Sequence, residues 1–439
     1  MTDRSASGDG RRPGGSGGAP LESLIMGDEN AVPATESAIE PFELTDDFYQ
    51  HPHAAYDELR GRGPAHFVRF PDGGTGWLIT DYEAAKAVFL DPTISKALKS
   101  EGARAALANA GVGARGAGGR FGDMLVFHDP PEHTRLRTLV NRAFSSRAVR
   151  ELAPRITELA DALLADLAGD AATDLDLLDR YAFPLPMLVI CELLGVPNEE
   201  RDNFRAWSTT LVSNDETAEA RGAALQQFVA YIDQLIGAKR EDPAGDLLSE
   251  LITVSEDGDK LSYRELIGMV FQLLFAGFAT TVNLISNAVA ILVSDNGIRA
   301  ALVQDPGRVR DFVEEVLRYE SPASEAGFRY TTVPVTVGSV EIPAGQRVLV
   351  SMAAADRDPA RFADPQTFDL DRADKNHLAF GYGIHRCVGA SLARMEGGIA
   401  LARLLAAYPD LELAAGAELS WRKSLNVRGL TGLPVRLRP

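Results

Sequence analysis

A cysteine in a short glycine-rich loop carries the strongest chemical signal in this sequence of 439 residues. The loop, residues 380–389, reads Phe-Gly-Tyr-Gly-Ile-His-Arg-Cys-Val-Gly, and a strongly helical stretch, 390–407, follows it. Backbone N–H groups at a helix start stabilise a thiolate, and glycines permit tight turns. A deprotonated Cys387 could therefore be the axial ligand of a haem iron, a ligand that favours O–O cleavage. An isolated cysteine would more often be a buried structural residue, so the patterned loop carries the argument.

The chain has one other cysteine, Cys191, in an apolar helical stretch. Two cysteines are too few for a disulfide framework or a multi-thiolate zinc site. We expect Cys191 to be a small buried core residue. The low cysteine content fits a reducing, cytoplasmic location.

Two further pairs place ionisable side chains on single helix faces. Glu315 and Arg318 are three residues apart, and His133 and Arg137 are four residues apart in a segment opened by Asp-Pro-Pro. These spacings bring the two side chains of each pair together on a helix. Taken alone, either pair would more often be an ordinary surface feature.

A run without charged residues, 266–294, contains the sequence Ala-Gly-Phe-Ala-Thr-Thr at 276–281. Its length alone makes it a candidate membrane span. Ser262 and Glu265 form a capping box at its start, and no second span or positive flank accompanies it. These features predict a buried core helix. The plain structural role of Thr280 there would be a hydrogen bond to the carbonyl four residues before it.

These residues must be positioned by a mainly α fold of the α+β class, because helices dominate and strands gather at the two ends of the chain. The segment 99–122 is rich in Gly and Ala and is expected to be a mobile, functional loop. The expected elements are a helix at 52–61, strands at 65–70 and 76–80, a helix-rich middle over about 131–319, strands at 330–337 and 347–352, and further strands near the C-terminus.

Composition sets the broad class and the domain organisation. Residues 1–40 show no apolar period and are predicted to be a disordered extension, and 41–439 are predicted to form a single domain, because no linker or repeat divides them. The pair Arg11-Arg12 is followed by glycines rather than an apolar stretch, so no secretory signal is predicted. The net charge of −18 argues against nucleic acid or an anionic membrane as a partner, and we expect a monomer.

The cysteine loop resembles the signature F-x-x-G-x-x-x-C-x-G of the cytochrome P-450 superfamily, and the resemblance runs from about residue 42 to the end of the chain. It implies the cytochrome P-450 fold, a helix-rich haem domain with small β-sheets. Four motifs match in the superfamily's order: H-x-x-x-R at 133–137, A/G-G-x-D/E-T-T at 276–281, E-x-x-R at 315–318 and the cysteine loop at 380–389.

The resemblance implies specific roles around the haem. Cys387 is then the axial ligand of the iron, Phe380 keeps water from the sulfur, and Gly381 and Gly389 give the loop its turn and its close approach to the porphyrin. The residues that match the superfamily's contacts to the haem propionates are His133, Arg137, Arg329 and His385.

Two further groups of residues receive roles in the same way. Glu315 and Arg318, locked by Arg372, are structural supports of the haem loop. Ala279 stands where the superfamily has an acid, so Thr280, Thr281, water or the substrate would have to deliver protons. The residues that match the superfamily's oxygen site are Ala276, Gly277, Thr280 and Thr281.

The implied activity is that of a haem-thiolate monooxygenase. Its cofactor would be haem b, and its electrons would come from NAD(P)H through a ferredoxin and its reductase. One atom of O2 would enter a C–H or C=C bond of a bulky apolar natural product, since the segments 60–69 and 77–80 look like those of soluble actinobacterial members that tailor macrolides. Oxidative coupling or peroxide-driven chemistry is an alternative suggested by Ala279, and a non-catalytic haem sensor is another.

A substrate pocket and a docking surface complete the prediction. The pocket is expected along 99–122, 322–327 and 424–427, with Phe278 and Ala279 making its oxygen side apolar. Basic residues near the thiolate could dock an acidic ferredoxin or could form an ordinary solvated face. The individual pocket residues are Phe278, Ala279, Ala323, Ser324 and Leu425, and the basic residues are Arg135, Arg386 and Arg394.

Overall fold

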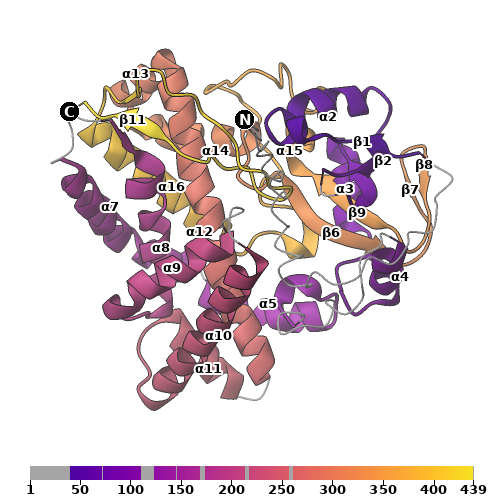
Figure 1. Ribbon diagram of the computed structural model, residues 1–439, viewed down its shortest axis with the longest axis horizontal. Helices are drawn as coiled ribbons and strands as arrows, with labels where there is room; N and C mark the ends of the chain where they lie inside the picture. The colour runs from indigo at the N-terminus through magenta and orange to yellow at the C-terminus, as the bar shows by residue number, and fades with distance from the viewer. Residues whose placement is uncertain are drawn as a thin grey trace, which may run out of the picture.

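A computed structural model describes residues 40–438 except 72, 110–122, 145, 169–173, 213–216 and 257–260. Helices fill one side of the molecule, and a six-stranded sheet with its covering helices lies on the other (Figure 1). The predicted disordered extension 1–40 lies outside the described residues except for its last position, as does most of the predicted loop 99–122.

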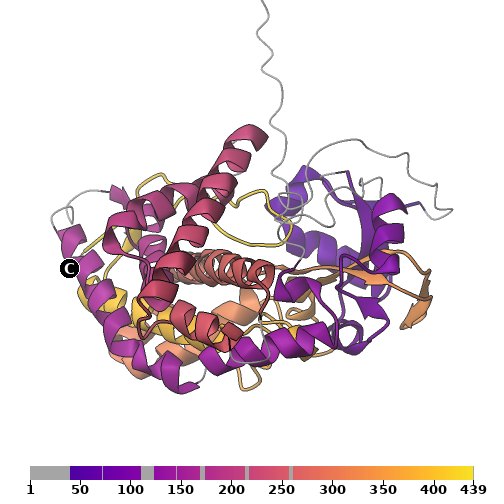
Figure 2. The same cartoon turned by 90° about the horizontal axis from the view of Figure 1, so that it is seen from below.

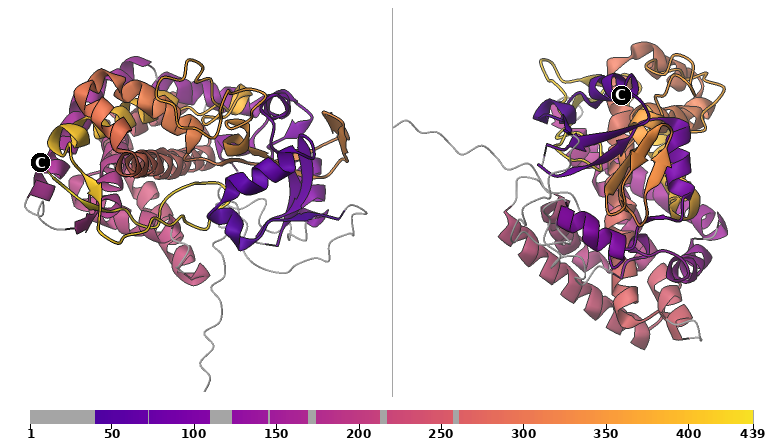
Figure 3. Two further views of the ribbon diagram at one scale, coloured as in Figure 1. Left: turned by 90° about the horizontal axis from the view of Figure 1, so that it is seen from above. Right: turned by 90° about the vertical axis from the view of Figure 1, so that its right-hand side faces the viewer.

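The main sheet joins segments from both ends of the sequence. Its strand order is β1-β2-β3-β9-β6-β4, with β3 parallel to β9 and β9 antiparallel to β6. Figure 3 shows these early and late strands side by side. The strands are β1 (Phe42–Glu43), β2 (Ala65–Arg69), β3 (Thr75–Ile79), β4 (Ile94–Ser95), β6 (Glu325–Thr331) and β9 (Arg347–Ser351).

Two smaller sheets lie outside it. One is the hairpin of β7 (Val335–Val337) and β8 (Val340–Ile342). The other has the order β10-β11-β5 and consists of β5 (Asp174–Asp176), β10 (Glu412–Leu413) and β11 (Pro434–Arg436).

The remaining described elements are mostly helices. Three short ones bear on the site: η3 (Leu125–Phe127), the π-helix η5 (Leu178–Ala182) and η8 (Gly383–His385). The α-helices are α2 (Pro52–Arg60), α3 (Tyr82–Leu90), α4 (Glu101–Asn109), α5 (Glu132–Ala143), α6 (Ser146–Glu151), α7 (Ala153–Leu167), α8 (Pro184–Leu194), α9 (Arg201–Val212), α10 (Ala218–Glu241), α11 (Leu247–Glu256), α12 (Tyr263–Ser294), α13 (Asn296–Gln304), α14 (Val309–Tyr319), α15 (Met352–Ala355) and α16 (Ala390–Ala407).

The longest helix, α12, runs through the centre of the molecule (Figures 1 and 2). The predicted capping box is present, because the Ser262 hydroxyl accepts from the Glu265 N–H and the Glu265 carboxylate accepts from the Ser262 N–H. Among the described residues it is the one helix apolar and long enough to cross a membrane, and 67% of its most apolar window is buried inside the protein. The burial favours the predicted role of a core helix.

Two element predictions need correction. Residues Glu101–Asn109 within the expected loop form the helix α4, whose Ala103, Ala106 and Leu107 pack into the core. The single strand expected at 330–337 is two strands, the end of β6 and the separate β7, because the chain leaves the main sheet after Thr331. Cys191 is fully buried in the core, as predicted.

Candidate active site

The cysteine loop is a closed turn ahead of α16. The Cys387 N–H donates to the Phe380 carbonyl at 2.8 Å, and the loop reverses through Gly381 and Gly383, both with positive φ. A Cβ on Gly383 would lie 3.0 Å from the Phe89 carbonyl oxygen, so this position needs glycine for both conformation and space. At Gly389 an added Cβ would meet only the Cys387 sulfur, at 3.9 Å, which leaves the space in front of the sulfur open.

Cys387 is surrounded by protein, and the surface that it leaves exposed faces a cavity. Burial raises the pKa of the thiol, against the lowering effects of the Gly389 backbone N–H and of Arg137, Arg386 and Arg394. The thiol therefore holds its proton more firmly than an exposed cysteine does. A metal ion that binds the sulfur would have to displace this proton.

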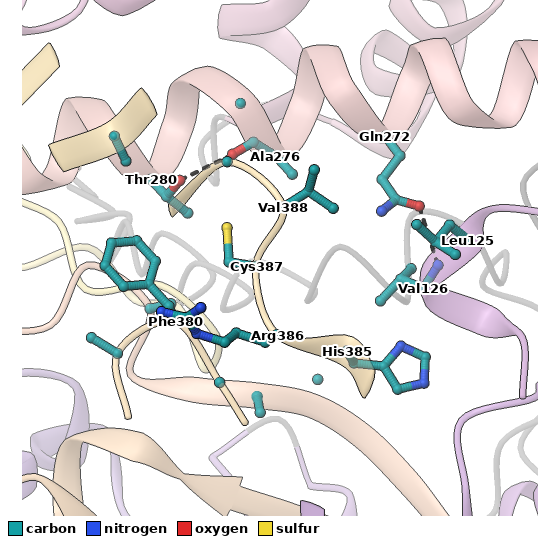
Figure 4. Close-up of a pocket in the computed structure, with 18 of the residues that line it drawn as sticks. Leu125, Val126, Gln272, Ala276, Thr280, Phe380, His385, Arg386, Cys387 and Val388 are labelled. Atoms are coloured by element: carbon teal, nitrogen blue, oxygen red, sulfur yellow. Dashed lines mark hydrogen bonds between the residues drawn. The ribbon is translucent and has the colours of Figure 1, made fainter. Parts of the chain in front are cut away.

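The cavity in front of the sulfur has a volume of about 390 Å³. Figure 4 shows the sulfur pointing toward α12, where Ala276 and Thr280 lie. The walls are mainly apolar, with Leu125, Val126, Val140, Phe144, Ile190, Met269, Leu273, Leu284 and Leu317 among the lining residues.

Basic side chains gather on one part of the cavity wall. The four predicted contacts His133, Arg137, Arg329 and His385 all line it. The two imidazole rings are 4.3 Å apart. Burial lowers the pKa of His385 to about 2, with Lys96 and Arg329 adding to the effect, and burial lowers the pKa of Arg329 to about 10.

Within the described chain, several nitrogens of this cluster lack a hydrogen-bond partner: Nε2 of His133, Nε2 of His385 and Nε of Arg329, all buried. Buried nitrogens without partners are costly, and the charges of Lys96 and Arg329 oppose protonation of His385. A ligand that brings carboxylates to this wall would relieve both. The thiol, the cavity and the cationic wall therefore fit an iron porphyrin with two acidic side arms.

Lys96 also belongs to this cationic wall, although no sequence motif indicated it. It lines the cavity and is 5% exposed. It follows the short strand β4, whose Ser95 hydroxyl and Lys96 N–H both donate to the carboxylate of Asp129, just before α5. No local pattern marks a lone lysine after a two-residue strand, so sequence reasoning had no signal for it.

The wall opposite the sulfur is formed by one face of α12. Ala276, Gly277, Thr280 and Thr281 all line the cavity, as predicted. The Thr280 hydroxyl donates to the Ala276 carbonyl at 3.0 Å, and the Thr281 hydroxyl donates to the Gly277 carbonyl at 3.2 Å. The structural hydrogen bond is thus present, and the hydroxyl oxygens keep lone pairs that can accept from a group in the cavity.

Four of the five predicted pocket residues lie elsewhere. Ala323 lines the cavity, but Phe278, Ala279, Ser324 and Leu425 do not. Two helical positions after Ala276 correspond to a rotation of about 200°, so Phe278 lies on the far side of α12, where it packs on Phe183 with ring centroids 5.7 Å apart. Ala279 packs against the core, and Leu425 is 3% exposed within it.

The predicted support of the haem loop is a buried ionic cluster. Arg318 donates to both carboxylate oxygens of Glu315, at 2.7 and 2.9 Å, and Arg372 donates to the same carboxylate at 3.0 Å. Arg318 also donates to the carbonyls of Asp356, Pro365 and Thr367. The cluster ties α14 to the segment that leads into the cysteine loop.

The proposed basic docking surface is less basic than its sequence suggests. Arg135 forms an ion pair with Glu265, and Arg394 donates to both carboxylate oxygens of Glu314 at 2.6 and 2.9 Å. Arg394 also lies over the Phe380 ring, 4.4 Å from its centroid. These two arginines are therefore paired with carboxylates of the same chain, whereas Arg386, next to Cys387 in the sequence, is exposed.

Comparison with known proteins agrees with this geometry. A family model for cytochrome P-450 matches residues 203–413. The chain is 45% identical to the vitamin D(3) 25-hydroxylase of Pseudonocardia autotrophica, covering 89% of this chain and 95% of that protein. It is 40% identical to the 6-deoxyerythronolide B hydroxylase of Saccharopolyspora erythraea, covering 90% and 98%. The solved structure of the monooxygenase TamI with tirandamycin C matches with a TM-score of 0.82 and 41% identity, covering 91% of this chain and all of that one.

The chain therefore belongs to the cytochrome P-450 family. It is a haem-dependent monooxygenase that receives electrons from NAD(P)H through a ferredoxin and its reductase.

Proposed function

We propose that this monooxygenase hydroxylates or epoxidises a bulky, largely apolar natural product of the polyketide or macrolide kind. The observation that carries the proposal is the mainly aliphatic lining of the part of the cavity beyond the porphyrin, where Leu125 and Val126 of η3 lie with Met269 and Leu273 of α12. Relatives named as hydroxylases of vitamin D(3) and of 6-deoxyerythronolide B, and the tirandamycin C complex, support it. Such a cavity binds its ligand through burial of apolar surface, with a few polar groups that fix its orientation.

In this proposal each part of the site has a separate task. Cys387 would bind the haem iron, and Phe380, Gly381 and Gly389 shape the loop around its sulfur. The ionic cluster of Glu315, Arg318 and Arg372 holds the loop in place. The cationic wall would bind the two propionates through His133, Arg137, Arg329 and His385. When bound, haem supplies activation of dioxygen, so that one oxygen atom enters the substrate and the other leaves as water.

The distal residues would position the reactants and move protons. Thr280 and Thr281 present hydroxyl oxygens to the cavity beside Ala276 and Gly277. Since Ala279 bears no acid, we infer that ordered water or a substrate hydroxyl, held by a hydrogen bond to the Thr280 oxygen, supplies the protons. We further propose a single domain over 41–439 that acts as a cytoplasmic monomer without a membrane or nucleic acid partner.

The ligand assignment is tested by Cys387→Ser. The strongly red-shifted Soret band of the ferrous–CO complex should disappear, because a serine oxygen is a harder and weaker donor than a thiolate. Cys191→Ser is the matched control, since that cysteine is buried in the core, and it should keep the band. An unchanged band in Cys387→Ser contradicts the assignment.

The substrate class is tested by titrating the ferric enzyme with a natural-product library and following the shift from low to high spin. Macrolides and other polyketides should be enriched among the ligands, and binding confined to small polar compounds contradicts the proposal.

Ala279 keeps peroxide-driven chemistry as a second candidate. Turnover on hydrogen peroxide alone, at a rate matching that with NAD(P)H and ferredoxin, would favour it.

A further inference from the structure

Gln272 is a neutral amide on the cavity wall, and neither the sequence motifs nor the haem site accounts for it. It lines the cavity from α12, four positions before Ala276 and eight before Thr280. The residues around it are apolar, with Met269 and Leu273 on the same helix. A polar side chain placed in an apolar wall costs free energy unless it has partners.

One partner fixes the orientation of this amide. The Val126 backbone N–H, in η3, donates to Gln272 Oε1 at 3.2 Å. A backbone N–H can only donate, so the oxygen must face Val126 and the nitrogen must lie on the other side. Figure 4 shows the amide nitrogen on the side where Val388 and Cys387 are drawn, away from Val126.

The amide nitrogen has no acceptor among the residues that the structure describes, so its two N–H groups face the cavity without a protein partner. Water can satisfy them while the cavity is open to solvent. An apolar substrate that displaces this water would leave both N–H groups buried without an acceptor, which weakens binding. A substrate with an oxygen at this point would avoid that cost.

We propose that Gln272 Nε2 is a specificity-determining donor that selects substrates with a neutral oxygen acceptor, such as a lactone or ketone carbonyl. This inference rests on the proposed function and names its substrate class more narrowly. Eight residues of α-helix rise by about 12 Å, so the acceptor lies on that order of distance from the carbon held near Thr280. A carboxylate is disfavoured, because one neutral amide cannot offset the desolvation of a charge among aliphatic side chains.

The test compares two rings of equal size, pentadecanolide with its ester and cyclohexadecane without it. Spectral dissociation constants on the haem-loaded ferric enzyme should show the lactone binding roughly ten-fold more tightly. Gln272→Met should reduce this preference to about one. Gln272→Glu still accepts from the Val126 N–H but has no N–H to offer, so it should lose the preference as well.

The matched control is Met269→Leu, which alters the apolar wall near Gln272 without touching a hydrogen bond and should keep the preference. Thermal unfolding of each variant checks that the fold is intact. If the preference persists in both Gln272 variants, or is absent in wild type that binds both rings, the role of Gln272 is wrong while the proposed function stands. If wild type binds neither ring, the proposed substrate class fails, and the inference fails with it.

Discussion

Glu396 in α16 predicts an unusual pH dependence of stability. Its side chain is 2% exposed, and within the described chain its Oε1 has no hydrogen-bond partner. The helix packs tightly there, since a Cβ on the neighbouring Gly397 would lie 2.9 Å from Leu284 of α12. Burial raises the pKa of the Glu396 carboxyl from 4.5 to about 8.

The sign of the effect follows from proton binding. Between pH 4.5 and about 8 the folded protein keeps the Glu396 proton and the unfolded chain has lost it. The folded state then binds more protons, so the free energy of unfolding falls as pH rises. At about 1.4 kcal/mol for each pH unit, the whole window corresponds to roughly 5 kcal/mol, of which about 3 kcal/mol is lost by pH 7.

Glu396→Gln removes this titration while keeping the shape of the side chain. Denaturant unfolding of the haem-loaded proteins from pH 5 to pH 8.5 should show the variant gaining on wild type by about 1.4 kcal/mol per pH unit until the gain levels off near pH 8. Glu418→Gln, at an exposed glutamate, should run parallel to wild type. Parallel curves for Glu396→Gln as well would refute the reasoning, because they would mean that the carboxyl ionises at an ordinary pH.

Three further substitutions test the site. Thr280→Ala should raise the hydrogen peroxide released per NAD(P)H consumed several-fold, because the cavity loses the hydroxyl proposed to position protons. An unchanged ratio would show that substrate or water supplies protons without this hydroxyl. Arg372→Met should lower the free energy of unfolding by about 3–5 kcal/mol, because Glu315 loses one of its two buried cations. The loss should be seen as a lower denaturant midpoint and as less bound haem per protein. Full haem loading at wild-type stability would contradict the supporting role. Gly383→Ala should cost about 1–3 kcal/mol in the same unfolding assay, because its positive φ and the nearby Phe89 carbonyl leave no place for a Cβ; wild-type stability would show that the loop can shift.

Local sequence signals predicted the elements around the cysteine well. The helix expected at 390–407 has those bounds in the structure, because a glycine turn ends immediately before it and an apolar run follows. The ion pair of Glu315 and Arg318 is buried as the motif implied. Helical spacing alone could not have shown this burial, since the same spacing is common on helix surfaces. The third member, Arg372, was predicted from the resemblance to the family. It lies in a turn 54 residues after Arg318 in the sequence.

Residues that depend on tertiary placement were missed or misplaced. Gln272 and Lys96 meet the cavity because α12 and the end of β4 pass beside it, and one sequence does not show which helix positions border a cavity. Phe278 could have been placed correctly from the sequence. Its rotation of about 200° from Ala276 puts the two residues on opposite faces of one helix.

Residue 279 has no acidic side chain, and its location shows which property of the site this absence affects. Because the methyl group of Ala279 does not line the cavity, it does not make the substrate site apolar. The apolar character comes instead from Leu125, Met269 and Leu273, so the substrate class and the proton supply are separate questions. The first depends on this wall and on the amide of Gln272. The second depends on Thr280, whose hydroxyl donates to the Ala276 carbonyl, which leaves its oxygen free to accept a hydrogen bond from water or substrate.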